Sequence, residues 1–154
     1  MTKPMLTRRL ILSLGAVAAF VPGASFAEGE TLHVAKSLTC GCCGAWVDHM
    51  RQAGFNVEVE NLEYDALQAL KARLGISPRH ASCHTARIAG YVIEGHVPAP
   101  DVRRLLQDRP QGIGLTVPGM PIGSPGMEMG DEREPYDVVL IKPDGSGETF
   151  QAHH

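Results

Sequence analysis

The sequence predicts an α/β protein with a thioredoxin-like fold, in which a mixed central sheet is flanked by helices. Segments in which apolar and polar residues alternate, typical of strands, take turns along the chain with segments of helical periodicity. The first strand, helix and strand follow one another closely, which implies parallel strands joined by a right-handed crossover. The expected order is β-α-β-α-β-β-α, followed by a loop and a closing hairpin.

The first half of the chain supplies the β-α-β unit and a second helix. Its expected elements are strands at 31–37 and 55–62 and helices at 44–54 and 64–75. Leu32 and Val34 alternate with polar neighbours in the first strand, which runs directly into a group of cysteines. Each helix has its apolar residues on one face and ends at a glycine, Gly54 or Gly75.

The second half supplies the rest of the sheet. Its expected elements are two short strands within 85–95, a helix at 99–110 and a hairpin at 136–152. The two short strands turn at Ala89-Gly90. Pro110 stops the helix because proline cannot donate the next helical hydrogen bond, and Asp144-Gly145 is a typical hairpin turn.

The N-terminus resembles an export signal. Basic residues precede a short apolar run at 10–21, and the small-x-small sequence at 25–27 suits cleavage. We expect residues 1–27 to be a cleaved signal peptide and residues 28–154 to form one exported thioredoxin-like domain. A short membrane anchor is the alternative. Paired arginines leave both the Sec and the twin-arginine routes open.

Charge and hydropathy exclude several classes of partner. Removing the signal lowers the Lys and Arg count from 14 to 11 against 17 Asp and Glu, a net charge of −6. Without a basic patch, nucleic acid and anionic membranes are not expected partners. Beyond the N-terminus no window of about 18 apolar residues exists, so we expect the mature protein to be soluble, with no membrane association.

Three of the four cysteines are crowded together. Cys40, Cys42 and Cys43 follow the first strand, whereas Cys83 comes forty residues later. In this fold the loop after the first strand leads into a helix N-terminus, where exposed amides and the helix dipole lower a thiol pKa. Because thiolate is both a nucleophile and a metal ligand, the position suits redox or soft-metal chemistry.

Several chemistries remain open for these cysteines. Cys40 and Cys43 have the Cys-x-x-Cys spacing of a thiol-disulfide oxidoreductase. The intervening Cys42 would scramble that disulfide by exchange, whereas Cu(I) favours thiolates that bridge several ions. A four-cysteine zinc site suits the adjacent cysteines poorly. Structural disulfides are the fourth possibility, because an exported protein with an even cysteine count invites them.

Cys83 should close the site from the other side. In a thioredoxin-like sheet, the loop that enters the third strand lies beside the loop that follows the first. His84 adjoins Cys83 and is a candidate to bind or orient a metal ion. His49 is a candidate to cap or support the site, whereas we expect other histidines to be surface or structural residues, among them His33, His80 and His96.

A second candidate patch lies in the Gly/Pro-rich loop at 117–130. Its three methionines, Met120, Met127 and Met129, have no helical spacing, so a role in the core is not obvious. Thioethers are soft ligands for Cu(I). We expect the loop either to contact or admit copper, or to pack as a lid over the site.

Three stretches together resemble the CopG-type periplasmic copper-resistance proteins, a former family of unknown function. They are LTCGCCGAWVDHMRQAGF, SCHTARIAGYVIEGHVPA and GLTVPGMPIGSPGMEMG. The resemblance covers residues 31–150 and implies a thioredoxin-like fold with a multinuclear copper cluster bridged by cysteine thiolates. The ligands it implies are Cys40, Cys42, Cys43 and Cys83. His84 and the methionines become neighbours of the cluster, and the family is associated with copper resistance and a proposed copper redox role.

The leading interpretation is that residues 28–154 form a periplasmic copper-binding domain that holds Cu(I) and contributes to copper resistance. This interpretation favours a metal-binding protein over an enzyme and leaves open a copper oxidoreductase that interconverts Cu(I) and Cu(II). A thiol-disulfide oxidoreductase using Cys40 and Cys43 is the second, and a chaperone that delivers copper to an efflux system is the third. Cys42 separates the first two, because a cluster requires it and a dithiol enzyme does not. Expected partners are copper ions and components of copper efflux or resistance systems.

Overall fold

The computed structural model describes residues 30–154, so the predicted signal peptide lies outside the described part of the chain. The strands are β1 (Thr31–Lys36), β2 (Asn56–Asn61), β3 (Thr85–Ile88), β4 (Tyr91–Glu94), β5 (Gly114–Thr116), β6 (Tyr136–Ile141) and β7 (Gly147–His153). The helices are α1 (Gly41–Gln52), α2 (Tyr64–Arg73) and α3 (Ala99–Asp108), with a short 3-10 turn at Pro78–His80.

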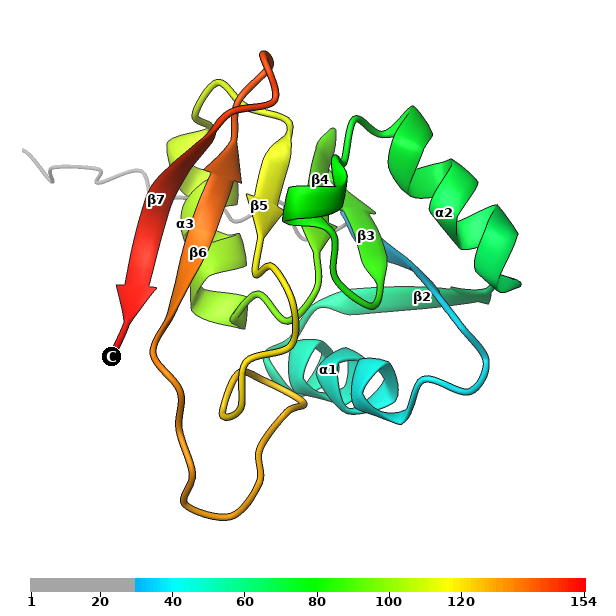
Figure 1. Ribbon diagram of the computed structural model, residues 1–154, viewed down its shortest axis with the longest axis vertical. Helices are drawn as coiled ribbons and strands as arrows, with labels where there is room; N and C mark the ends of the chain where they lie inside the picture. Colours follow the sequence, from blue (N-terminus) through cyan, green and yellow to red (C-terminus); the bar gives the residue numbers. More distant parts are fainter. Residues whose placement is uncertain (1–29) are drawn as a thin grey trace, which may run out of the picture.

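All seven strands form one mixed sheet in the order β2-β1-β3-β4-β5-β6-β7 (Figure 1). β1 pairs in parallel with β2, and β4 with β5, while the other neighbours are antiparallel. The prediction of an α/β fold with a mixed central sheet is therefore confirmed. The arrangement of the first four strands with α1, α2 and α3 is compatible with the thioredoxin-like expectation.

The helices cover both faces of the sheet. α1 and α3 share the larger core, in which Trp46, Met50 and Leu105 are fully buried against residues of β1, β3 and β4. In Figure 1 α3 lies behind β5 and β6. The segment that follows α2 packs Ile76 against Val92 and Ile141 in a separate, smaller cluster.

α1 begins three residues earlier than predicted, at Gly41 instead of residue 44. Cys40 is consequently the N-cap residue, and Cys42 and Cys43 lie in the first helical turn rather than in a preceding loop. The predicted end of α1 is close to correct, because Gly54 adopts a left-handed φ of 87° just beyond it.

The short strand β5 was not predicted, because its sequence is typical of a glycine-rich loop. Gly114 pairs with Val92 of β4. A Cβ atom at position 114 would lie 1.8 Å from the Val92 carbonyl oxygen, so the two backbones approach closely only because residue 114 is glycine. Glycine at position 114 thus makes the segment resemble a loop in the sequence and also allows it to pair in the structure. β5 joins the hairpin of β6 and β7 to the rest of the sheet.

The loop between β5 and β6 returns to α1 and lies beside it (Figure 1). A Cβ atom on Gly126, whose φ is 86°, would approach the Trp46 backbone nitrogen at 2.7 Å and the Cys42 carbonyl oxygen at 2.8 Å. Glycine at this position therefore lets the loop pack directly against the first turn of α1. In residues 30–154 no helix has the length and apolar character needed to cross a bilayer.

Candidate metal centre

The site begins where β1 ends and α1 begins. Cys40 and Cys43 lie three residues apart, on the same face of the first helical turn, and form a disulfide with a Cα–Cα distance of 5.4 Å. Cys42 is a free thiol whose sulfur lies 3.5 Å from the Cys40 sulfur. The pair with Cys-x-x-Cys spacing is thus the one that is oxidised, and a third thiol lies within reach of it.

Cys83 is the fourth cysteine of the group and comes from the segment that enters β3. β3 is antiparallel to β1, with Thr85 paired to Ala35, so the residues that enter β3 lie beside those that leave β1. The four cysteine sulfurs all lie within 4.8 Å of one another. The expectation that the Cys83 sulfur lies beside the other three is confirmed. We call this group the sulfur cluster; its members are Cys40, Cys42, Cys43 and Cys83.

The sulfur cluster fits a soft metal ion in its donor chemistry and in its size. Two thiolates bound to one ion at about 2.3 Å each lie at most roughly 4.6 Å apart. No two of the four sulfurs are more than 4.8 Å apart, so in the dithiol state small side-chain rotations would bring them onto shared ions. Cys43 is buried and the other three are half-buried, so the cluster lies at the edge of the core rather than in open solvent. All four sulfurs become available only when the Cys40–Cys43 disulfide is reduced.

Two imidazoles lie on the Cys83 side of the cluster. The Cys83 sulfur is 3.0 Å from His96 Nε2 and 3.4 Å from His84 Nδ1. Both histidines are 0% exposed. We call Cys83, His84 and His96 the hairpin donors, because they flank the β3–β4 hairpin. Their donor atoms lie within 4.8 Å of one another.

A backbone carbonyl of the 117–130 loop fixes the tautomer of His96. His96 Nδ1 lies 2.8 Å from the Pro125 carbonyl oxygen. Because a carbonyl oxygen only accepts hydrogen bonds, the bonding assigns the proton to Nδ1. His96 Nε2 then presents its lone pair to the Cys83 sulfur, the arrangement usual for a metal-binding histidine.

Sequence reasoning missed His96, which it expected at the surface or in a structural role. The available signal was the register of the predicted hairpin. Thr85 pairs with Glu94 across β3 and β4, so two positions further along the same ladder Cys83 faces His96. A turn at Ala89-Gly90 predicts this pairing. His84, by contrast, lies beside Cys83 as expected.

Burial sets the proton states of these groups. Burial lowers the pKa of His84 well below its ordinary value, with a smaller contribution from His96, and burial also lowers the pKa of His96. Both imidazoles are therefore neutral and able to act as ligands near neutral pH. Burial, reinforced by the neighbouring Cys42, raises the pKa of Cys83 to about 12. Cys83 is consequently a thiol that must release a proton to bind a metal ion.

A buried ion pair holds the residue before Cys83. Lys71 is 2% exposed and Glu94 is 0% exposed, and the Lys71 ammonium donates to a Glu94 carboxylate oxygen at 2.5 Å. The same oxygen accepts the backbone N–H of Ser82 at 2.7 Å. The Thr85 hydroxyl donates to the other oxygen at 2.6 Å. In α2 both Leu67 and Lys71 are buried, and Lys71 is the residue that joins this helix to the site.

The three methionines and His49, the remaining candidates from the sequence, make no hydrogen bond to a cysteine sulfur within residues 30–154. Met120 and Met129 are 50% and 59% exposed, and Met127 is half-buried. The 117–130 loop contacts the site through the backbone of Pro125 and Gly126. His49 Nε2 accepts the backbone N–H of Ala99 at 3.2 Å, so it caps the start of α3 rather than contacting a cysteine.

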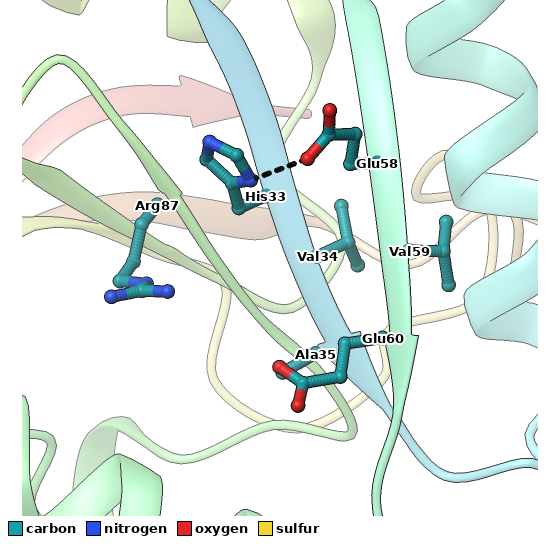
Figure 2. Close-up of a pocket in the computed structure, with 7 residues that line it drawn as sticks. All are labelled: His33, Val34, Ala35, Glu58, Val59, Glu60 and Arg87. Atoms are coloured by element: carbon teal, nitrogen blue, oxygen red, sulfur yellow. Dashed lines mark ion pairs between the residues drawn. The ribbon is translucent and has the colours of Figure 1, made fainter.

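A surface pocket over β1, β2 and β3 contains none of the cysteines. Figure 2 labels its residues, among which His33 Nδ1 lies 3.1 Å from Glu58 Oε2. Both side chains are more than half exposed. The pocket is therefore an open surface feature, separate from the sulfur cluster.

Comparisons with known proteins point to copper. The model of a family described as a protein of unknown function, DUF411, matches residues 80–127, which include all three hairpin donors. A solved structure of a copper resistance protein copG, Form 2, is 40% identical with a TM-score of 0.75, covering 81% of this chain and 98% of that chain. Form 1 is 41% identical with a TM-score of 0.74, covering 80% and 96%. A search of curated proteins gives no match.

Proposed function

The chain belongs to the CopG family of copper resistance proteins, and we propose that it is an exported, periplasmic copper-binding protein that holds Cu(I) in a multinuclear cluster. The ligands are the four thiolates of the sulfur cluster. One observation carries the proposal: four sulfurs, one of them forty residues from the others, lie within 4.8 Å of one another. An exported chain carrying such a site would contribute to copper resistance by sequestering Cu(I).

The donor set favours Cu(I) among the available metals. Thiolate is a soft ligand that Cu(I) prefers, and it can bridge two ions. Cys42 and Cys43 are adjacent in one helical turn, whereas structural zinc sites usually take cysteines from spaced pairs, so the set suits several bridged ions better than one tetrahedral zinc ion. The exposed thioethers of Met120 and Met129 are soft groups where the loop meets solvent, and we assign them to copper capture. Interconversion of Cu(I) and Cu(II) at the site belongs to the same proposal.

A second candidate function is thiol-disulfide oxidoreductase, and the Cys40–Cys43 disulfide favours it. In that function the reduced pair would transfer two electrons to a substrate disulfide and become the disulfide seen here. Cys42 argues against it, because a free thiol 3.5 Å from the Cys40 sulfur can attack the disulfide and exchange with it.

Copper loading of Cys42→Ser separates the two functions. Reduced, oxygen-free protein is loaded with Cu(I), desalted and analysed for copper per chain. We expect Cys42→Ser to retain half the wild-type copper or less, because a serine oxygen cannot replace a bridging thiolate. Thr39→Ala, an exposed neighbour of Cys40 that keeps all four sulfurs, should load like the wild type. Wild-type copper loading by Cys42→Ser, together with catalysed reduction of a model disulfide, would contradict the cluster and establish the oxidoreductase.

A further inference from the structure

We propose that Cys83, His84 and His96 form a second, mixed imidazole–thiolate site, which binds a divalent first-row ion while Cys40 and Cys43 are joined as a disulfide. In a copper-resistance protein that ion is Cu(II). The choice of Cu(II) rests on the proposed function, whereas the existence of the site rests on the geometry of the hairpin donors alone.

The spacing of the hairpin donors suits one ion. Bonds of about 2.0 Å to nitrogen and 2.3 Å to sulfur place tetrahedral ligands roughly 3.3–3.8 Å apart. The Cys83 sulfur lies 3.0 Å from His96 Nε2 and 3.4 Å from His84 Nδ1. The three donor atoms all lie within 4.8 Å of one another. A small outward shift of one side chain would therefore admit an ion between them.

Both imidazoles are held in place from outside the site. The Pro125 carbonyl accepts the proton of His96 Nδ1 and leaves Nε2 free as a ligand. The His84 ring packs at a tilt against Trp46, at a ring-centroid distance of 4.4 Å, and edge-on against His96 at 5.1 Å. His84 Nε2 is buried without a hydrogen-bond partner. The opposite nitrogen, Nδ1, is the one that faces Cys83.

The disulfide makes the two sites alternatives to each other. When Cys40 and Cys43 are bonded together, two of the four sulfurs are lost to coordination and the Cu(I) cluster cannot assemble. Cys83 is still free in that state. Imidazole is a favourable ligand for Cu(II), whereas thiolate bridging favours Cu(I). Because Cys83 belongs to both donor sets, the dithiol state of Cys40 and Cys43 offers the four-sulfur set, whereas the disulfide state offers the hairpin donors.

Cobalt(II) titration of the disulfide form tests the site, because thiols do not reduce Co(II). Protein that retains two free thiols per chain is titrated without oxygen. We expect one Co(II) per chain, with a sulfur-to-cobalt charge-transfer band and the visible bands of tetrahedral coordination. His96→Gln, which keeps a polar side chain in the buried space, should weaken Co(II) binding by more than about tenfold. Cys83→Ser should remove the charge-transfer band.

His33→Ala is the matched control, because His33 is an exposed histidine that faces Glu58 on another part of the sheet. It should titrate like the wild type. If folded His96→Gln and folded His84→Gln bind Co(II) as tightly as the wild type does, the proposed site is wrong. Co(II) binding that appears only after the disulfide is reduced would also overturn it. Neither result would bear on Cu(I) loading of the reduced protein, which tests the proposed function separately.

One equivalent of Cu(II) added to the same disulfide form tests the choice of ion. The frozen sample should give an electron paramagnetic resonance signal with nitrogen superhyperfine structure, and His96→Gln should lose part of that structure. A silent sample, or a signal without nitrogen coupling, would contradict the assignment of Cu(II).

Discussion

The two sides of the site are built in different ways. On the α1 side, three cysteines come from four consecutive residues, and their relative positions follow from one helical turn. On the hairpin side, Cys83 and His96 are thirteen residues apart and meet because β3 and β4 pair in one register. The α1 side contains the disulfide, whereas the hairpin side is held by a buried ion pair and a backbone carbonyl.

Because the two sides are built differently, the redox state of the cysteines on α1 is independent of the positions of the hairpin donors. Reduction of Cys40 and Cys43 would raise the number of available sulfurs from two to four, and we expect the fold to stay the same because both residues lie at the start of one helix. The hairpin donors keep their places as long as the sheet, Lys71 and the 117–130 loop are intact. One side of the site can therefore respond to the redox environment while the other preserves the positions of its donor atoms.

The largest expected effect is on the hairpin side. Lys71→Met leaves the Glu94 carboxylate buried without its counter-charge, and we expect it to lower the free energy of unfolding by about 3–5 kcal/mol. Urea denaturation of the metal-free protein measures this. Lys142→Met is the control, because its ion pair with Glu148 is partly exposed on the Lys142 side and exposed on the Glu148 side and should contribute at most about 1 kcal/mol. Similar losses in the two variants would show that the buried pair does not support the hairpin side.

The next effect concerns the loop that contacts both sides. Gly126→Ala introduces a Cβ atom that clashes with the backbone of α1, in a left-handed conformation. Gly130→Ala is also left-handed but has open space around it. We expect about 1–2 kcal/mol of destabilisation for Gly130→Ala from backbone strain, and roughly 1–3 kcal/mol more for Gly126→Ala. Thermal unfolding compares them, and equal losses would contradict the contact between loop and helix.

A smaller effect should appear with pH. The folded pKa values of His84 and His96 lie below the ordinary 6.5, so the unfolded chain takes up protons first as the pH falls. Stability is then fully present above pH 6.5 and falls below it, by up to about 1.4 kcal/mol per pH unit for each histidine, until the folded pKa is reached. Urea denaturation at pH 7.5 and 5.5 should show a smaller loss for His96→Gln than for the wild type. An equal or larger loss would contradict a buried, neutral His96.

The smallest effect is expected at the exposed methionines. Met120→Leu and Met129→Leu preserve side-chain size and should change the free energy of unfolding by less than about 0.5 kcal/mol. Copper per chain should stay constant, while Cu(I) capture, followed by stopped-flow competition with a coloured chelator, should slow because two soft groups are lost. A loss of copper per chain would instead make these residues ligands.

The sequence was most informative about the order of the elements and about which loops that order brings together. Periodicity predicted the order of the first seven elements, and the fold argument placed Cys83 beside the other cysteines. The joining of Cys40 and Cys43 was left open, because the same three residues in one turn allow either a disulfide or shared metal ions. The export signal and periplasmic location stay predictions, since they rest on residues outside the described part of the chain.

Long-range register and buried polar groups were not predicted. His96 was assigned to the surface or to a structural role because nothing in its immediate sequence resembles a metal site, and only its cross-strand partner reveals it. Lys71 occupies an interior position normally filled by an apolar residue, because Glu94 compensates its charge. β5 was missed because Gly114, which allows close pairing with Val92, also resembles a loop residue.

The central claim, that four cysteine sulfurs converge to hold Cu(I), is tested most directly by copper X-ray absorption of the reduced, Cu(I)-loaded protein. The account predicts a first shell dominated by sulfur at about 2.3 Å, with a second shell of neighbouring copper from ions that share thiolates. Cys83→Ser should weaken both shells, since this residue closes the cluster. A first shell of nitrogen or oxygen, or a sulfur shell that is unchanged in Cys83→Ser and shows no neighbouring copper, would contradict the four-sulfur site.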